Sequence, residues 1–142
     1  MTMKVGELLF LDTNILLTAT SEDRDSHHLA LDLFTLAPAS GIHLAVSGQV
    51  LREYLVVATR PPGSNGLGLS TSDAIRNVKA FQSRTLFLDE PEAVTERLFD
   101  LIDAYGLSGK RIHDANIVAV MKTHLVSTIL TSNTSDFAPF QE

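Results

Sequence analysis

Residues 7–14 read Glu-Leu-Leu-Phe-Leu-Asp-Thr-Asn, an apolar run that ends in three polar residues. The apolar part has the length and composition of a short buried β-strand. Asp12 and the two residues after it are of the types that cap the amino terminus of a helix, so we expect a helix over about 14–19. The stretch thus predicts a strand that passes directly into a helix, with the Asp12 carboxylate at the junction.

Apolar segments alternate with segments of helical periodicity along the rest of the chain. Pro38 is expected to end the second helix, Ser47 to cap the third, and Asp114 to open the last long one. Strands are expected at 42–46, 85–88 and 126–130, and helices at about 28–37, 48–59, 70–83, 91–106 and 114–124.

The expected strands are continuously apolar, which is typical of a mostly parallel sheet with helices on both faces. Ligands in such folds gather outside the carboxyl ends of the strands. Four acidic residues fall at that edge, since Asp12 and Asp136 follow strands, whereas Glu53 and Asp114 lie near the starts of helices. The sequence therefore predicts four carboxylates at one edge of an α/β fold.

Carboxylates gathered in this way are the oxygen ligands that divalent cations prefer, and metal pairs held by them commonly hydrolyse phosphodiesters. Three of the four also have a purely structural explanation. Asp12 and Asp114 suit the amino-terminal ends of helices, and Asp136 suits a capped turn. The joint placement of the four acids, rather than any one of them, indicates a metal-dependent nuclease.

Glu53 is the least ordinary of the four, because its neighbours at helical spacing are apolar. A glutamate on such a face does not serve solubility. A metal or proton-transfer role is as reasonable for it as a buried ion pair. The apolar neighbours are Val50, Val56 and Val57, with Gln49 on the remaining side. Asn14 is expected to orient Asp12 by donating a hydrogen bond.

The composition is that of one globular domain spanning 1–142, with 44% apolar and 20% charged residues. There is no cysteine, which excludes disulfides, thiolate metal sites and cysteine nucleophiles. No apolar run reaches the roughly 18 residues of a membrane span, and no signal-peptide pattern is evident. An intracellular, cytoplasmic protein is expected.

The net charge of -6 is unusual for a protein that binds nucleic acid. Bound cations would reverse the local field at the four acids. Arg52, Arg60 and Lys110 are candidates for contacts to phosphate groups.

The ordered set of motifs resembles the PIN-domain family, and more closely the VapC-type toxins of bacterial toxin–antitoxin pairs. The order is an Asp after the first strand, a helix Glu, a helix-opening Asp-Ala, and Thr-x-Asn-x-x-Asp-Phe at 131–137. The loop over 58–70 is also similar. The resemblance spans nearly the whole chain and implies a PIN-like three-layer α/β/α sandwich around a mostly parallel sheet of four to five strands.

The resemblance further implies a Mg²⁺- or Mn²⁺-dependent endoribonuclease that hydrolyses RNA with a metal-activated water. Asp12, Asp114 and Asp136 would be ligands, and Glu53 would complete the catalytic set. A homodimer and a small cognate antitoxin, which blocks the site with a basic side chain, are also implied. Residues expected to support the ligands are Asn14, Thr131 and Asn133.

One position departs from the family pattern. Asn133 stands where some members carry an acid, so Asp136 must supply the closing charge, and one-metal and two-metal sites both remain open. A catalytically weak PIN domain that binds RNA or protein is an alternative. A Mg²⁺-dependent phosphatase is a further one, although it would want a second Asp where Asn14 stands.

Overall fold

The computed structural model describes residues 6–140, and within this range four parallel strands form one sheet in the order β3–β2–β1–β4. The strands are β1 (Leu8–Leu11), β2 (His43–Ser47), β3 (Leu86–Leu88) and β4 (Thr128–Leu130). The helices are α1 (Thr13–Thr20), α2 (His27–Ala39), α3 (Gly48–Thr59), α4 (Thr71–Ser83), α5 (Glu92–Tyr105), α6 (Arg111–Thr123) and α7 (Thr134–Phe137), with short 3₁₀ segments η1 (Pro62–Ser64) and η2 (Ala138–Phe140).

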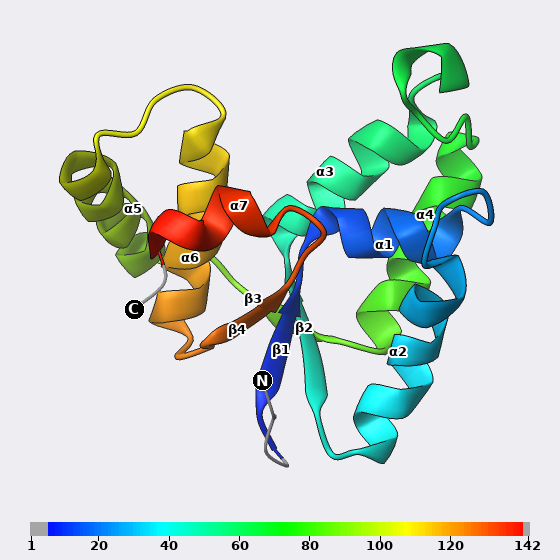
Figure 1. Cartoon of the computed structure of the whole chain (residues 1–142), viewed down its shortest axis with the longest axis horizontal. Helices are drawn as coiled ribbons and strands as arrows, with labels where there is room; N and C mark the ends of the chain where they lie inside the picture. The colour runs from blue at the N-terminus through cyan, green and yellow to red at the C-terminus, as the bar shows by residue number, and fades with distance from the viewer. Residues whose placement is uncertain (1–5, 141–142) are drawn as a thin grey trace.

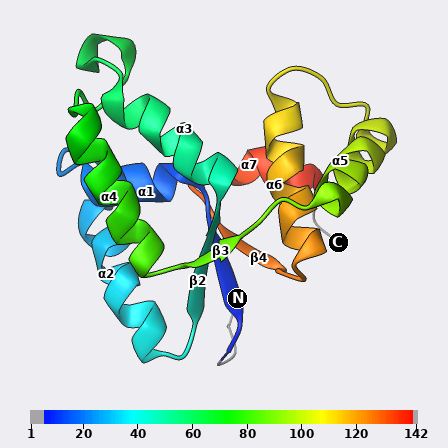
Figure 2. The ribbon, with the colours of Figure 1, turned by 180° about the vertical axis from the view of Figure 1, so that it is seen from behind.

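Helices cover both faces of the sheet. In Figure 1, α1–α4 lie on one side and α5–α7 on the other, and the view from behind in Figure 2 shows the same division. This confirms the predicted three-layer α/β/α fold with a parallel sheet. None of the helices within 6–140 combines the length and apolar character needed to cross a bilayer.

The centre of the core is β1, which is paired on both edges. Phe10 lies opposite Ala45 of β2 and Ile129 of β4. Phe10 and Leu11 are 0% exposed, as expected for a strand that is covered on both faces. The strand therefore fixes the position of Asp12, the residue that directly follows it.

The side of β1 on which the chain adds new strands changes before β4. The chain first adds β2 and β3 on one side of β1 and later places β4 on the other side. Open α/β sheets bind their ligands outside the carboxyl ends of the strands at such a reversal. Asp12 follows β1 and Thr131 follows β4, so both lie at this point of the fold.

Two local predictions about helix ends were wrong in detail. Helix α2 includes Pro38 and ends at Ala39, because a proline in the last turn removes only one donor, and the Ala37 and Pro38 carbonyls still accept from Ile42 and Gly41. Ser47 occupies the N-cap position of α3, but its hydroxyl makes no capping hydrogen bond and is buried without a partner among the described residues.

The connection between α3 and α4 is a closed loop. The amides of Leu67 and Leu69 donate to the carbonyls of Val57 and Ala58 at 3.1 and 2.9 Å. A Cβ at Gly66 would lie 1.8 Å from the Arg60 carbonyl oxygen, so this tight packing requires glycine. The loop projects from the end of α3 opposite to its start at the sheet (Figure 1).

Candidate active site

Asp12 is held at the junction of β1 and α1 by hydrogen bonds to both of its carboxylate oxygens. Oδ1 accepts from the Thr13 amide at 2.8 Å, so the residue caps α1 as predicted. Oδ2 accepts from Thr131 Oγ1 at 2.8 Å and from Asn14 Nδ2 at 3.3 Å. Only 8% of Asp12 is exposed. The side chain is thus oriented before any ligand binds.

The segment after β4 is tied to the start of α1 through Asn14. Its Oδ1 accepts from the Ser132 amide at 3.1 Å. Thr131 Oγ1, which donates to Asp12, also accepts from the Asn133 amide at 3.0 Å. Asn14 and Thr131 therefore contact Asp12 directly, whereas Asn133 acts only through its backbone, and its side chain is exposed.

Glu53 lies in the second turn of α3, half-buried, and both of its carboxylate oxygens accept hydrogen bonds. Oε1 accepts from Gln49 Nε2 at 2.9 Å. Oε2 accepts from Thr13 Oγ1 at 3.2 Å. Thr13 directly follows Asp12 in the sequence. Its hydrogen bond therefore anchors the Glu53 carboxylate beside Asp12.

Asp114 lies in the first turn of α6, which begins at Arg111, three residues before the predicted opening. Its pKa is raised, first by burial, then by the negative charges of Asp136 and Asp12 and, last, of Glu53, while Arg111 lowers it. The negative charges of all three other acids act on Asp114. The fold therefore does bring the four carboxylates to one edge of the sheet.

Asp136 comes from the short helix α7, in its first turn, and is half-buried. Asn133 occupies the N-cap position of this helix without a side-chain cap bond. The predicted turn beyond the last strand is therefore a four-residue helix, and Asp136, not Asn133, is the residue that acts electrostatically on Asp114.

Comparison with known proteins assigns the family. Residues 9–139 match the sequence model of the PIN domain. The chain belongs to the PIN-domain family. A comparison with curated protein sequences gives no significant match, so the assignment rests on this domain model and on the fold.

Solved structures of toxins share the fold of this PIN domain. Mycobacterium tuberculosis VapC20, a sarcin-ricin loop cleaving toxin, has a TM-score of 0.71 and 15% identity over 94% of this chain and 96% of that chain. VapBC2 from Rickettsia felis, bound to a promoter DNA fragment, gives 0.66 and 21% over 93% and 92%. A toxin–antitoxin complex from Klebsiella pneumoniae gives 0.63 and 23% over 92% and 90%.

The acidic edge of this PIN domain has the chemistry of a site for a hard divalent cation, but it is not closed around one. Within 6–140, no three carboxylate or imidazole side chains lie close enough together to enclose an ion. The donors are nevertheless all oxygens, which Mg²⁺ and Mn²⁺ prefer. Burial is the largest cause of the raised pKa of Asp114, and the repulsion by the other acids that adds to it is what a cation would relieve.

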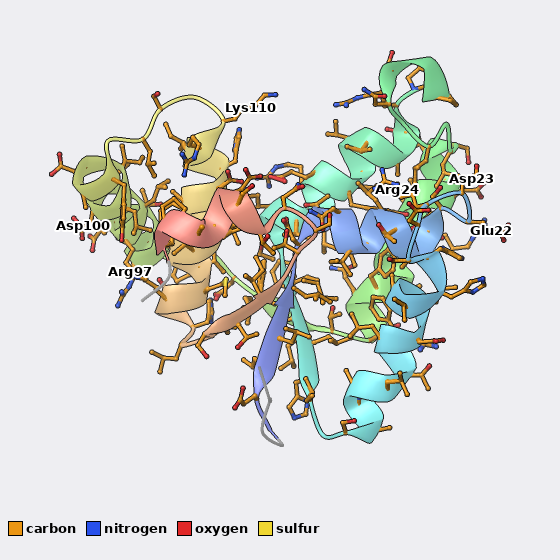
Figure 3. All side chains as sticks on the ribbon, viewed as in Figure 1. Glu22, Asp23, Arg24, Arg97, Asp100 and Lys110 are labelled. Atoms are coloured by element: carbon orange, nitrogen blue, oxygen red, sulfur yellow. The ribbon has the colours of Figure 1, made fainter. Side chains whose placement is uncertain are left out.

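The three basic residues predicted to contact phosphate are all exposed. Lys110 precedes α6, and Figure 3 shows it at the amino-terminal end of that helix. Arg60 follows the last residue of α3 and is seven residues beyond Glu53, about 10 Å along the helix. Arg111, which the sequence reasoning did not single out, is the cation that acts on Asp114.

The sequence reasoning placed Gln49 beside Glu53 but did not predict the hydrogen bonds that join them to α6. Gln49 is 3% exposed and donates to both Glu53 and the His113 carbonyl. Asn116 in turn donates to Gln49 Oε1 at 2.7 Å. The available signal was the spacing of Gln49, which lies one helical turn before Glu53.

Replacing Asp114 with Asn is expected to stabilise the cation-free PIN domain at neutral pH. The fold raises the pKa of Asp114 above 3.8, so the native state holds this proton at a pH at which the unfolded chain has lost it, and stability falls as pH rises through that window. Asn is never ionised and escapes this loss.

Thermal unfolding in EDTA at about pH 4 and about pH 7 measures the effect. Asp114→Asn should raise Tm by a few degrees at the higher pH and by much less at the lower one. An equal change in Tm at both pH values would show that ionisation of Asp114 is not the cause.

Proposed function

We propose that this PIN domain is a metal-dependent endoribonuclease that serves as the toxin of a toxin–antitoxin pair. The observation that carries the proposal is the electrostatic coupling of Asp114 to the three other acids at the reversal point of the sheet. The fold it shares with VapC20, which is a sarcin-ricin loop cleaving toxin, supports RNA as the substrate.

Three acids from different elements would hold Mg²⁺ or Mn²⁺, namely Asp12, Asp114 and Asp136. When bound, the cation would lower the pKa of a water molecule and neutralise charge on the phosphoryl oxygens. Glu53 would orient the attacking water through a carboxylate that two donors already hold in place. Thr131 and Asn14 keep Asp12 facing the site.

A cognate antitoxin that inserts a basic side chain would fit the negative charge at this edge, which Arg111 offsets only in part. The Klebsiella pneumoniae relative is a toxin–antitoxin complex, and VapBC-1 from Haemophilus influenzae has 16% identity and a TM-score of 0.64. We also propose that the protein forms a homodimer and acts in the cytoplasm.

A catalytically weak PIN domain that binds RNA or protein is the second candidate. It is favoured by the open arrangement of the acids and by the neutral, exposed Asn133. Cation-dependent cleavage of RNA by the purified chain would identify an endoribonuclease, whereas binding without cleavage would identify a binding module.

The chemistry of the cleaved ends tests the proposal. A cation that activates water makes a histidine base unnecessary, so attack by water is expected rather than attack by the RNA 2′-hydroxyl. End-labelling of the cleavage products should give 5′-phosphate and 3′-hydroxyl ends. A 2′,3′-cyclic phosphate end would sink the proposed hydrolysis.

A further inference from the structure

Gln49 is almost completely buried beside the acidic edge, although amide side chains are mostly exposed in folded proteins. Only 3% of it is exposed. Its Nε2 donates to Glu53 Oε1 at 2.9 Å and to the His113 carbonyl oxygen at 2.9 Å. Its Oε1 accepts from Asn116 Nδ2 at 2.7 Å. One side chain thus contacts the carboxylate on α3 and two residues of α6.

The surrounding groups allow this amide only one orientation. The His113 carbonyl can only accept, so the nitrogen of Gln49 must face it, and the second N–H then faces Glu53. The Glu90 carboxylate accepts from Asn116 Nδ2 at 3.1 Å. This contact fixes the orientation of the Asn116 amide, so the same nitrogen also donates to Gln49 Oε1. The hydrogen bonds therefore run in a fixed direction from Asn116 through Gln49 to Glu53.

The Glu53 carboxylate is held from two sides by this arrangement. Gln49 holds Oε1, and Thr13 holds Oε2 at 3.2 Å. Two donors on different elements restrict the rotation of a side chain that would otherwise sample several rotamers.

Gln49 also links the two helical layers at the site. Helices α3 and α6 lie on opposite sides of the sheet (Figures 1 and 2). The His113 carbonyl that accepts from Gln49 belongs to the residue directly before Asp114. Two hydrogen bonds from one amide nitrogen therefore connect the Glu53 carboxylate to the backbone beside Asp114.

We propose that Gln49 is a positioning residue, which fixes the Glu53 carboxylate and sets its separation from Asp114. As a statement about catalysis this rests on the proposed ribonuclease function. The two hydrogen bonds themselves can be tested in the absence of cation or RNA.

The first test is kinetic and uses Gln49→Met, which keeps the length of the side chain and removes its donors. Loss of a group that orients a ligand or a catalytic carboxylate typically costs about 10- to 100-fold in activity. We expect kcat for RNA cleavage to fall by that factor while KM stays nearly unchanged, because Gln49 is too buried to touch RNA. When Glu53 has already been replaced with Gln, Gln49→Met should not lower kcat any further.

Asn77→Ala is the matched control for stability. Asn77 is a half-buried amide, and its Nδ2 donates to Tyr54 Oη at 3.2 Å rather than to one of the four acids. It should lower Tm without changing kcat. An unchanged kcat in Gln49→Met, or the same fall in kcat with and without Glu53, would overturn the proposal.

The second test does not use activity. In the metal-free protein, the side-chain amide signals of Gln49 in a ¹H–¹⁵N NMR spectrum should shift when Glu53 is replaced with Gln, because a charged acceptor becomes a neutral one. Signals that stay in place would overturn the proposal. If the wild-type chain cleaves no RNA, the ribonuclease proposal fails, and this spectrum still decides whether Gln49 positions Glu53.

Discussion

Replacing Asp12 with Asn is expected to reduce RNA cleavage by at least about 100-fold, because even the neighbours of metal ligands typically contribute about 10- to 100-fold. The substitution keeps the shape of the side chain and removes its charge. Asn can also still cap α1, so the chain should remain folded. Single-turnover cleavage of an RNA oligonucleotide at fixed Mn²⁺ concentration measures the loss.

Asp100→Asn is the matched control, since it makes the same change in charge. Asp100 is exposed on α5, and Figure 3 shows it on the outer side of that helix, away from the sheet. It should cleave RNA at the wild-type rate. Equal cleavage rates for the two variants would remove Asp12 from the catalytic centre.

Features that depend on neighbouring residues were predictable from the sequence. The apolar run before Asp12 and the capping residues after it place the end of β1 and the start of α1 correctly. The gathering of four acids also followed from a general property of parallel sheets, namely that their carboxyl ends share one edge. The coupling of Asp114 to Asp12, Glu53 and Asp136 agrees with it.

Features that depend on distant segments were not predictable. Thr131 donates to Asp12 across 119 residues of sequence, and Gln49 donates to the His113 carbonyl across 64. No local pattern encodes such pairs, because they arise only when the sheet brings β4 beside β1 and the helical layers meet. The sequence therefore named the acids and Asn14 as a donor to Asp12. Thr131 entered only through the family resemblance, and the donors to Glu53 were not predicted.

Helix ends show the same limit on a smaller scale. Pro38 was expected to end α2, but the carbonyls of the last turn find donors in the following residues, and the helix continues to Ala39. Ser47 has the right residue type for a cap, yet its hydroxyl makes no capping bond. Residue type favours a helix end, and the tertiary contacts decide where it falls.

Removal of divalent cations is the second change with a large expected effect. The four acids leave negative charge, which Arg111 offsets only in part, at the edge where a phosphodiester would have to bind. A cation there contributes several kcal/mol to stabilising the charge of the transition state, which corresponds to a loss of at least about 100-fold in rate when it is removed. The core consists of apolar side chains, so the loss should be reversible.

The cleavage rate of one RNA oligonucleotide, measured before EDTA, in EDTA and after Mn²⁺ is restored, tests the central claim most directly. We predict that cleavage by the wild-type chain stops in EDTA and returns with Mn²⁺, and that Asp114→Asn stays inactive throughout. Cleavage that continues undiminished in EDTA, or that survives in Asp114→Asn, would contradict an acidic, cation-dependent centre at this edge of the sheet.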